Sequence, residues 1–409
     1  MKILWLCNVE IPQISRILGK QAPVFGGWLA QTAERLCTEH RLHVLYPDSE
    51  QRSGGSGNLT YQSFSGQDDQ AVMAESLEQF QPQVIHVWGT EVKHTDDFMQ
   101  VAERMGMLDR CAVSIQGLVS AYDRHYTEGL PEQVVRRYTL RDRIKGESIA
   151  DRRRAFARRG EYEVDALRRA KHIIGRTEWD RACTSQINPE ATYHFCNETL
   201  RPAFYQARWE LELAQRHSIF VSQCSYPIKG MHLLLEAMPL ILARFPDAVV
   251  YTTGPDLLHA SPKARLLRTS YQRYLLELIA QFGLQEHVRF LGMLSETEMR
   301  ERYLASHVFV SPSTIENSPN SVGEAMLLGT PVVSSYVGGT MSMMTHGQEG
   351  FLYQSTAPYM LADYVNQIFS DDELAKTFSR NARARAAVTH DPELNHARLL
   401  EIYETLREG

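Results

Sequence analysis

The chain has 409 residues, of which 43% are apolar, 22% charged and 9% aromatic; this is the composition of a folded globular protein and excludes a disordered or fibrous one. At roughly 100 to 200 residues per domain, the length favours two domains that each bury a core of their own. The 43 Lys and Arg against 49 Asp and Glu give a formal charge of −6, which argues against a surface built as a whole to hold nucleic acid.

Short runs rich in Val, Ile and Leu recur between longer segments of helical periodicity. This pattern is typical of parallel strands that are covered on both faces. We therefore expect an α/β fold with two doubly wound, Rossmann-like domains in tandem. The predicted strands are 2–9, 42–47, 84–89, 112–117 and 172–177 in the first half, and 219–223, 248–254, 288–292, 308–313 and 331–337 in the second.

A proline followed by a charged, polar stretch precedes the first strand of the second half, at 198–218, and marks the predicted join. The expected parts are an N-terminal domain (1–210), a C-terminal domain (211–390) and a terminal helix (391–409) that can pack back towards the N-terminal domain. The segment RSGGSGN (52–58) is predicted to be an exposed loop.

Six cysteines lie far apart, with no C-x-x-C pair and no Cys/His cluster at zinc spacing. This favours reduced thiols in a cytoplasmic protein and predicts no metal site. No run reaches about 18 uninterrupted apolar residues, so we expect no membrane-spanning helix.

The segment 131–160 holds ten Arg or Lys against four Asp or Glu, with apolar residues interleaved. A basic amphipathic region of this kind suits an anionic membrane surface, at the inner face of the membrane, or a lipid diphosphate acceptor. A solvated helix face with internal salt bridges explains the charges equally well. Nucleic acid is a weaker alternative, because no recognised binding motif accompanies the charge.

The most informative stretch is SPSTIENSPNSVGEAMLLGTPVVSSYVGG (311–339). A predicted strand ends in a polar loop that contains Glu316, and a helix is predicted to begin at Asn320 or Ser321, with Glu324 near its first turn. The unpaired N–H groups and the positive dipole end of a helix N-terminus attract anions such as a diphosphate. In isolation, the two glutamates are better explained as a solvated loop residue and a carboxylate that serves the helix dipole.

The residues around the two glutamates resemble the family 4 glycosyltransferases, retaining enzymes of GT-B fold. Their signature is E-x7-E, then A-M-x-x-G-x-P-V-V and a Gly-Gly turn. The matching positions here are Glu316, Glu324, Ala325, Met326, Gly329, Pro331, Val332, Val333, Gly338 and Gly339. The resemblance extends back through YPIKGMHLLLEA (226–237) to GRTEWDRA (175–182).

This resemblance implies a central cleft between the two domains, in which the C-terminal domain binds a nucleoside diphosphate sugar. Glu316 then holds the sugar near its anomeric carbon and Glu324 holds the ribose. Lys229, in P-I-K-G, neutralises the diphosphate, where charge grows as the glycosidic bond breaks. A surface lysine beside a helix is the alternative interpretation of Lys229.

Two positions depart from the family pattern. The family commonly has an arginine five residues before the lysine, where this chain has Cys224. Pro319 falls where the family usually offers backbone N–H groups, and proline has none to give. Asn320 and Ser321 are therefore the predicted phosphate donors.

In the N-terminal half, Gly26 and Gly27 resemble the family's glycine turn, which lets the backbone approach the donor phosphate; a plain helix-entry turn is the alternative. Gln116 stands where many relatives place a histidine, and a neutral amide can position a hydroxyl but takes no proton. Gln116 and His86 are the acceptor-side candidates, although a histidine at such a position more often serves packing or lies at the surface.

The predicted function is therefore metal-independent, retaining transfer of a sugar to a hydroxyl of a growing, lipid-linked glycan in polysaccharide biosynthesis. The nucleotide sugar is the donor substrate, and no cofactor is expected. A non-catalytic protein of the same fold that binds a sugar nucleotide or a glycan is the alternative, favoured by Cys224, Pro319 and Gln116.

Overall fold

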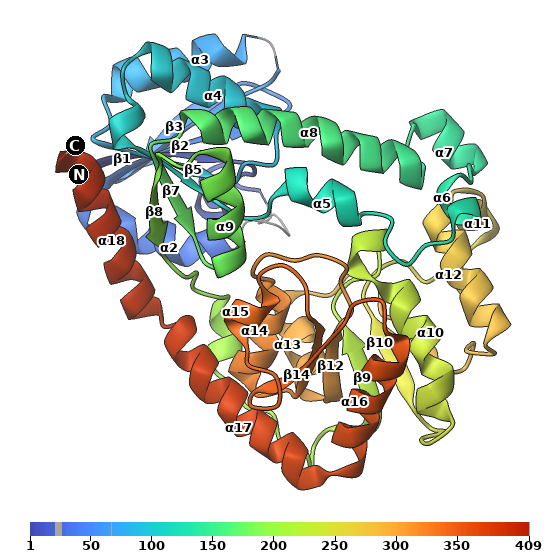
Figure 1. Ribbon diagram of the computed structural model, residues 1–409. Coiled ribbons are helices and arrows are strands. Elements are labelled where there is room, and N and C mark those ends of the chain that lie inside the picture. The colour runs from blue at the N-terminus through green and yellow to red at the C-terminus, as the bar shows by residue number, and fades with distance from the viewer. Residues whose placement is uncertain (21–26, 67, 409) are drawn as a thin grey trace. The chain divides into compact units, whose positions relative to one another are not determined.

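The computed structural model describes residues 1–20, 27–66 and 68–408. The chain divides into two compact units (Figure 1). Unit 1 comprises Met1–Ser120, Arg158–Arg201 and Thr389–Gly409, and unit 2 comprises Ala121–Ala157 and Pro202–Val388.

Unit 1 is built on an eight-stranded sheet in the order β3-β4-β2-β1-β5-β6-β7-β8. All neighbours pair in parallel except β3 and β4, which form an antiparallel hairpin. β1 is almost wholly buried along its length, as expected of a central strand covered on both faces. The strands are β1 (Lys2–Cys7), β2 (Arg41–Pro47), β3 (Ser53–Ser56), β4 (Leu59–Phe64), β5 (Val84–Trp88), β6 (Cys111–Ser114), β7 (His172–Gly175) and β8 (Thr192–Phe195).

Helices connect these strands in the manner of a doubly wound fold, and the last helix of the chain packs in the same unit. They are α1 (Pro12–Ile17), α2 (Gly27–Glu39), α3 (Asp69–Phe80), α4 (Lys93–Arg104), α5 (Val119–His125), α8 (Ile149–Arg169), α9 (Glu178–Ile187), α18 (Pro392–Glu408) and the 3-10 turn η1 (Leu108–Arg110). α5 and α8 each span a boundary between the two units.

Unit 2 is built on a six-stranded, wholly parallel sheet in the order β11-β10-β9-β12-β13-β14. Figure 1 shows α13 and α14 on one face of this sheet and α10 and α16 on the other. The strands are β9 (Gln215–Val221), β10 (Val249–Thr252), β11 (Val288–Phe290), β12 (Ser306–Ser311), β13 (Val332–Ser335) and β14 (Gly350–Tyr353).

The helices of unit 2 include two short ones that precede its sheet in the chain. The helices are α6 (Glu132–Val135), α7 (Leu140–Lys145), α10 (Met231–Leu242), α11 (Pro262–Leu266), α12 (Ser270–Gln281), α13 (Glu296–Leu304), α14 (Asn320–Leu328), α15 (Thr340–Met343), α16 (Pro358–Ser370) and α17 (Asp372–Thr389), with 3-10 turns η2 (Pro202–Tyr205) and η3 (Pro227–Lys229). No helix in the described part of the chain is both long and apolar enough to cross a bilayer.

The expectation of two parallel α/β domains is confirmed, whereas one local prediction is wrong. The segment 52–58 is not an open loop, because Ser53–Ser56 pairs with Leu59–Phe64 as the β3-β4 hairpin. A Cβ at Gly55 would lie 2.6 Å from the carbonyl oxygen of Leu59, so the glycine that suggested a loop allows the close approach of the two strands.

The two compact units differ from the expected ranges 1–210 and 211–390 at residues 121–157, which belong to unit 2. The last helix belongs to unit 1, the part towards which 391–409 is expected to pack. In unit 1 the Tyr403 hydroxyl accepts a hydrogen bond from Trp5 Nε1 at 2.9 Å, and Tyr403 is fully buried. The C-terminal helix therefore completes the core under β1.

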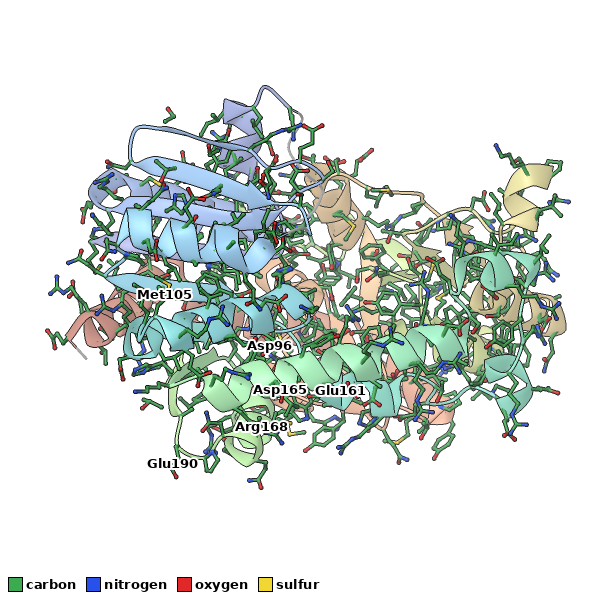
Figure 2. The ribbon with its side chains drawn as sticks, turned by 90° about the horizontal axis from the view of Figure 1, so that it is seen from above. Asp96, Met105, Glu161, Asp165, Arg168 and Glu190 are labelled. Carbon is green, nitrogen blue, oxygen red and sulfur yellow. The ribbon has the colours of Figure 1, made fainter. Side chains whose placement is uncertain are left out.

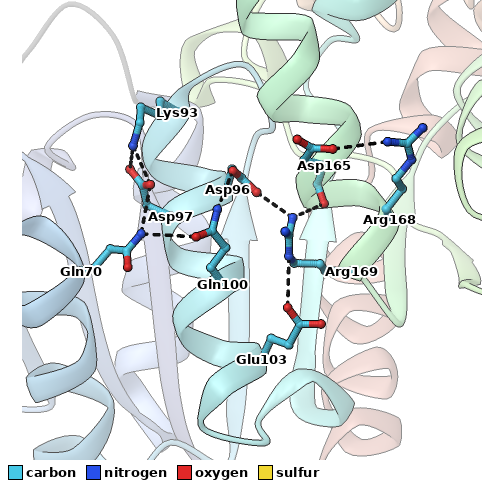
Figure 3. Close-up of polar contacts among 9 residues, drawn as sticks. All are labelled: Gln70, Lys93, Asp96, Asp97, Gln100, Glu103, Asp165, Arg168 and Arg169. Atoms are coloured by element: carbon cyan, nitrogen blue, oxygen red, sulfur yellow. Dashed lines mark hydrogen bonds and ion pairs between the residues drawn. The ribbon is translucent and has the colours of Figure 1, made fainter.

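Charged side chains join α4 to the C-terminal part of α8 within unit 1 (Figure 3). Arg169 of α8 contacts Asp96 at 2.9 Å and Glu103 at 3.1 Å, both in α4. Arg168 contacts Asp165 at 3.3 Å within α8 itself. Burial raises the pKa of Asp96, and the Arg169 guanidinium works against that shift. These contacts hold two helices that are distant in the sequence.

Candidate functional site

Three adjacent strands of unit 2 end at the same edge of its sheet, and the chain segments that follow them carry the predicted site. β9 and β13 both pair with β12, in parallel. Polar residues after β9 lead to Lys229, the loop after β12 carries Glu316, and the turn after β13 contains Gly338. Ligands in parallel α/β sheets bind at this carboxyl edge.

Lys229 and Glu316 meet at this edge. The Nζ atom of Lys229 lies 2.5 Å from Oε1 of Glu316, and the Ser313 hydroxyl donates a hydrogen bond to the same oxygen at 2.8 Å. The Glu316 side chain is 10% exposed and that of Lys229 is 23% exposed. The pair is thus nearly enclosed by protein but retains access from outside.

Lys229 is held in its charged form. Burial disfavours the charge, but the Glu316 carboxylate and the neighbouring Tyr226 outweigh burial and raise the pKa of Lys229 above its usual range. The Nζ atom also lies 5.9 Å from the centroid of the Tyr226 ring. The site therefore presents a fixed cation at neutral pH.

Two glycines on either side hold the loop that carries Glu316. Gly230 has φ of +68°, and a Cβ there would lie 1.7 Å from the Pro312 carbonyl oxygen. Gly338 has φ of +49°, and a Cβ there would lie 2.0 Å from the Glu316 carbonyl oxygen. The Gly339 N–H donates to that same oxygen at 3.0 Å. These close backbone approaches fix the direction in which Glu316 leaves the loop.

Helix α14 begins four residues after Glu316. Pro319 is its N-cap, and its carbonyl accepts the N–H groups of Val322 and Gly323 at 3.0 and 3.2 Å. Asn320 and Ser321 come before Val322 and Gly323 in the chain. The helix therefore has no carbonyl one turn earlier to accept the N–H groups of Asn320 and Ser321. Glu324 follows on the same helix and is 4% exposed.

Cys224 lies in a buried position at the same edge. Its thiol donates to the Thr253 carbonyl at 3.1 Å, and burial raises the pKa of Cys224 to about 11. A neutral thiol provides no positive charge, so Cys224 does not replace the arginine that the family pattern carries there.

The segment 121–130 also contacts this edge of the sheet, which the sequence did not predict. The expected domain ranges place it in the N-terminal domain, but it packs in unit 2. The His125 carbonyl accepts from the Thr314 hydroxyl at 2.9 Å, and the Glu128 carbonyl contacts His232 Nε2 at 3.1 Å. Local sequence patterns contain no signal for such a long-range packing preference.

In unit 1, Gln116 follows β6 and belongs to a polar cluster. Its side-chain amide donates to Glu198 Oε1 at 2.7 Å, and Arg176 pairs with Glu198 Oε2 at 2.6 Å. Gln116 is thus oriented by a carboxylate that Arg176 holds in place. Its role towards an acceptor stays a prediction.

His86 is placed in the core of unit 1. It is 0% exposed, and its two ring nitrogens contact the hydroxyls of Tyr403 at 2.7 Å and Ser114 at 2.6 Å. Burial lowers the pKa of His86 to about 3. These contacts favour packing, and the acceptor-side role of His86 is an untested prediction.

Gly27 is the first residue of α2, and Gly26 lies outside the described residues. Their predicted role at the donor phosphate therefore stays a prediction.

A second polar group gathers where β1 and β5 end. Asn8 follows β1, and its Oδ1 lies 2.9 Å from His94 Nε2 while its Nδ2 donates to Glu91 at 3.3 Å. Burial raises the pKa of Glu91 to about 7. These side chains combine donors and acceptors of the kind that bind hydroxyl groups.

Unit 1 also has a hollow on its charged surface beside α8, and Figure 2 shows Asp165, Arg168 and Glu190 around this part of the molecule. Its arginines are occupied in the contacts of Figure 3, so we assign it no ligand. Among the described residues, no three His, Cys, Asp or Glu side chains are grouped as metal ligands.

The fold is that of GT-B glycosyltransferases. The chain is similar to sucrose-phosphate synthase from Thermosynechococcus elongatus, with a TM-score of 0.70 and 16% identity over 99% of both chains. It is also similar to HepE from Anabaena, solved in complex with UDP, with a TM-score of 0.69 and 17% identity over 99% of this chain and all of the other.

Part of the chain also matches a known family in sequence. Residues 205–385 match the family described as Glycosyl transferases group 1. D-inositol 3-phosphate glycosyltransferase from Corynebacterium urealyticum is 30% identical over 179 residues, which is 44% of this chain and 41% of that relative. The aligned part thus spans about two fifths of that relative's length. The chain carries a group 1 glycosyltransferase domain, and the predicted resemblance is confirmed for this part.

Proposed function

We propose that the protein is a glycosyltransferase that moves a sugar from a nucleoside diphosphate sugar to an acceptor hydroxyl. The observation that carries the proposal is the contact of Lys229 with Glu316, four residues before the N-terminus of α14. A charged lysine, a carboxylate and the first N–H groups of a helix together suit a sugar linked to a diphosphate.

In this proposal Lys229 turns from Glu316 to the diphosphate when the donor binds. The Glu316 carboxylate, released from the ion pair, holds hydroxyls of the sugar near its anomeric carbon, and Glu324 holds the ribose. The N–H groups of Asn320 and Ser321 contact the phosphates. Lys229 can make this exchange because its flexible side chain carries a charge that either anion neutralises.

We further propose that transfer retains the anomeric configuration and needs no metal or cofactor. The bond from the anomeric carbon to the diphosphate breaks, and a bond to the acceptor oxygen forms on the same face. The proton of the acceptor hydroxyl passes to the departing diphosphate. Lys229 and α14 stabilise the charge that develops on this leaving group.

The proposed acceptor is a hydroxyl of a growing, lipid-linked glycan in polysaccharide biosynthesis, bound by the N-terminal domain. The Gln116–Glu198 contact supplies an oriented amide for such a hydroxyl. We also propose a cytoplasmic location with peripheral contact to the inner face of the membrane through 131–160.

Donor turnover tests the proposal. The purified protein is incubated with UDP-, GDP- and ADP-sugars, with water or added glycosides as the acceptor of the sugar. The released nucleotide is measured with and without EDTA. We expect release from one nucleotide class, unchanged by EDTA, with the product anomer matching the donor in NMR spectra. No release from any donor, with simple glycosides or a lipid-linked glycan as acceptor, would contradict the proposal.

The second candidate function is binding of a sugar nucleotide without turnover. It is favoured by Cys224, whose buried, neutral thiol adds no cation to the site. Saturable binding of a donor in the same experiment, without release of nucleotide even with acceptors, would identify this function.

A further inference from the structure

Unit 2 exposes a group of large apolar side chains far from its core. Leu140 and Ile144 of α7 are 65% and 72% exposed, and Leu266 and Leu267, at the end of α11, are 67% and 53% exposed. Apolar side chains that are exposed singly are common, but four within two neighbouring segments indicate an interaction surface.

Asp142 explains why the apolar side chains of α7 face outward. Its carboxylate is buried and accepts the N–H groups of Thr139 and Ser270, both at 3.0 Å. Residues two positions apart on a helix point in nearly opposite directions, so Leu140 and Ile144 lie away from the side that Asp142 anchors.

The same contact brings the second segment close. Ser270 begins α12, directly after the α11 connection that carries Leu266 and Leu267. Figure 1 shows α6, α7 and α11 together at one margin of unit 2. The two apolar pairs therefore belong to one surface.

This surface is positively charged. Arg143, Lys145, Lys263 and Arg265 are exposed on the same two segments, and none of the ion pairs within the described ranges involves them. By contrast, two other arginines of 131–160 are paired: Arg137 with Glu277 at 2.5 Å, and Arg141 with Glu147 at 2.5 Å. Positive side chains without an acidic partner among the described residues thus surround the exposed leucines and isoleucine.

We propose that this docking surface, defined as Leu140, Arg143, Ile144, Lys145, Lys263, Arg265, Leu266 and Leu267, binds the headgroup region of an anionic bilayer. The apolar side chains enter the boundary between headgroups and acyl chains, and the cations contact lipid phosphates. A second copy of the same surface is disfavoured as the partner, because it presents the same charge. This inference rests on the proposed function and extends its lipid-linked acceptor to a membrane contact. Half of the residues in the docking surface lie outside 131–160.

Vesicle binding tests the docking surface without relying on turnover. The full chain is sedimented with phosphatidylcholine vesicles, with and without added phosphatidylglycerol. We expect binding only with the anionic lipid. Because each Lys or Arg contributes roughly fivefold to partitioning, Arg143→Gln with Lys145→Gln should weaken binding by roughly twentyfold. Leu140→Ser with Ile144→Ser, and Leu266→Ser with Leu267→Ser, should each weaken it roughly tenfold or more.

Leu213→Ser is the matched apolar control, because Leu213 is 77% exposed in unit 2 but follows the acidic residues Glu210 and Glu212. Arg380→Gln is the charge control. Unchanged binding in both controls, with unchanged thermal unfolding of every variant, supports the surface. Three results would overturn it: equal binding to neutral vesicles, binding insensitive to all the leucine and isoleucine substitutions, or a dimer in sedimentation velocity that Leu140→Ser abolishes. Vesicle binding without nucleotide release from any donor would contradict the proposed function alone.

Discussion

Lys229 and Glu316, 87 positions apart in the chain, form an ion pair of 2.5 Å between Nζ and Oε1. Each residue follows a different parallel strand, and the two strands are neighbours in the sheet. The pair neutralises two charges that are otherwise costly to keep at an enclosed site. In the proposed function, a diphosphate sugar that binds there replaces Glu316 as the partner of Lys229.

The first prediction concerns Glu316 itself. Glu316→Gln keeps the shape of the side chain but removes its charge, so transfer should fall by roughly 100- to 1,000-fold, with nucleotide affinity preserved because Lys229 is released. Initial rates and nucleotide titrations measure the two effects. Glu212→Gln is the control, since Glu212 pairs with Lys376 at 3.0 Å elsewhere in unit 2. Full activity of Glu316→Gln would refute the assigned role.

The second prediction concerns Gly230. Gly230→Ala should be less stable than Gly283→Ala by about 1–3 kcal/mol, because only the first places a Cβ against backbone. Gly283 is a matched control: its φ is +67°, close to the +68° of Gly230, and no atom lies within 4 Å of the added Cβ. Urea unfolding compares the two variants. Equal losses would mean that the loop of Glu316 moves freely.

The third prediction concerns the C-terminal helix. Tyr403→Phe removes the hydroxyl that contacts both Trp5 Nε1 and His86 Nδ1. Unfolding free energy should fall by about 1–3 kcal/mol, because two buried polar groups lose a partner. Tyr359→Phe, at a tyrosine that is 64% exposed, should cost almost nothing. A neutral Tyr403→Phe in denaturant titrations would argue against a structural role for this helix.

The fourth prediction concerns pH. Burial lowers the pKa of His86 to about 3 and that of His232 to about 4, so below pH 6.5 the unfolded chain takes up protons that the folded chain does not. Stability should therefore fall as pH falls from 7 to 5, with each such proton contributing about 1.4 kcal/mol per pH unit. Urea midpoints across this range measure the slope, which His86→Gln should reduce. A flat profile would contradict the buried, neutral histidines.

The fifth prediction concerns Cys224. Cys224→Arg introduces the residue of the family pattern into a position that is 2% exposed. Stability should fall by roughly 3–5 kcal/mol, because the charge gains no buried partner, while Cys224→Ser should be tolerated. Thermal unfolding distinguishes them. A stable Cys224→Arg with tighter nucleotide binding would mean that the position belongs to the diphosphate site after all.

The sequence predicted the features that local patterns determine. Buried apolar runs identified the strands that frame the site, and the spacing of Glu316 and Glu324 identified the loop and the helix between β12 and β13. The direct contact between Lys229 and Glu316 could not be predicted from either segment alone, because it depends on the order of β9 and β12 in the sheet.

Other features could not be predicted from the sequence for a similar reason. The segment 121–130 joins unit 2 through carbonyl contacts with Thr314 and His232, and carbonyl groups carry no residue-specific signal. The glycines of 52–58 suggested an open loop because their role in a close strand pairing appears only in three dimensions. His86 is a further case, since one of its polar partners is Tyr403, 317 positions away.

Calorimetric titration of nucleoside diphosphates and their sugars, beginning with UDP, into the wild-type chain and Lys229→Met tests the central claim most directly, with Lys376→Met as the control. We predict saturable binding of one nucleotide class to the wild type and to Lys376→Met, and affinity at least roughly tenfold lower for Lys229→Met. Equal affinity in all three proteins, or no binding of any nucleotide, would contradict the assignment of this edge as the donor site.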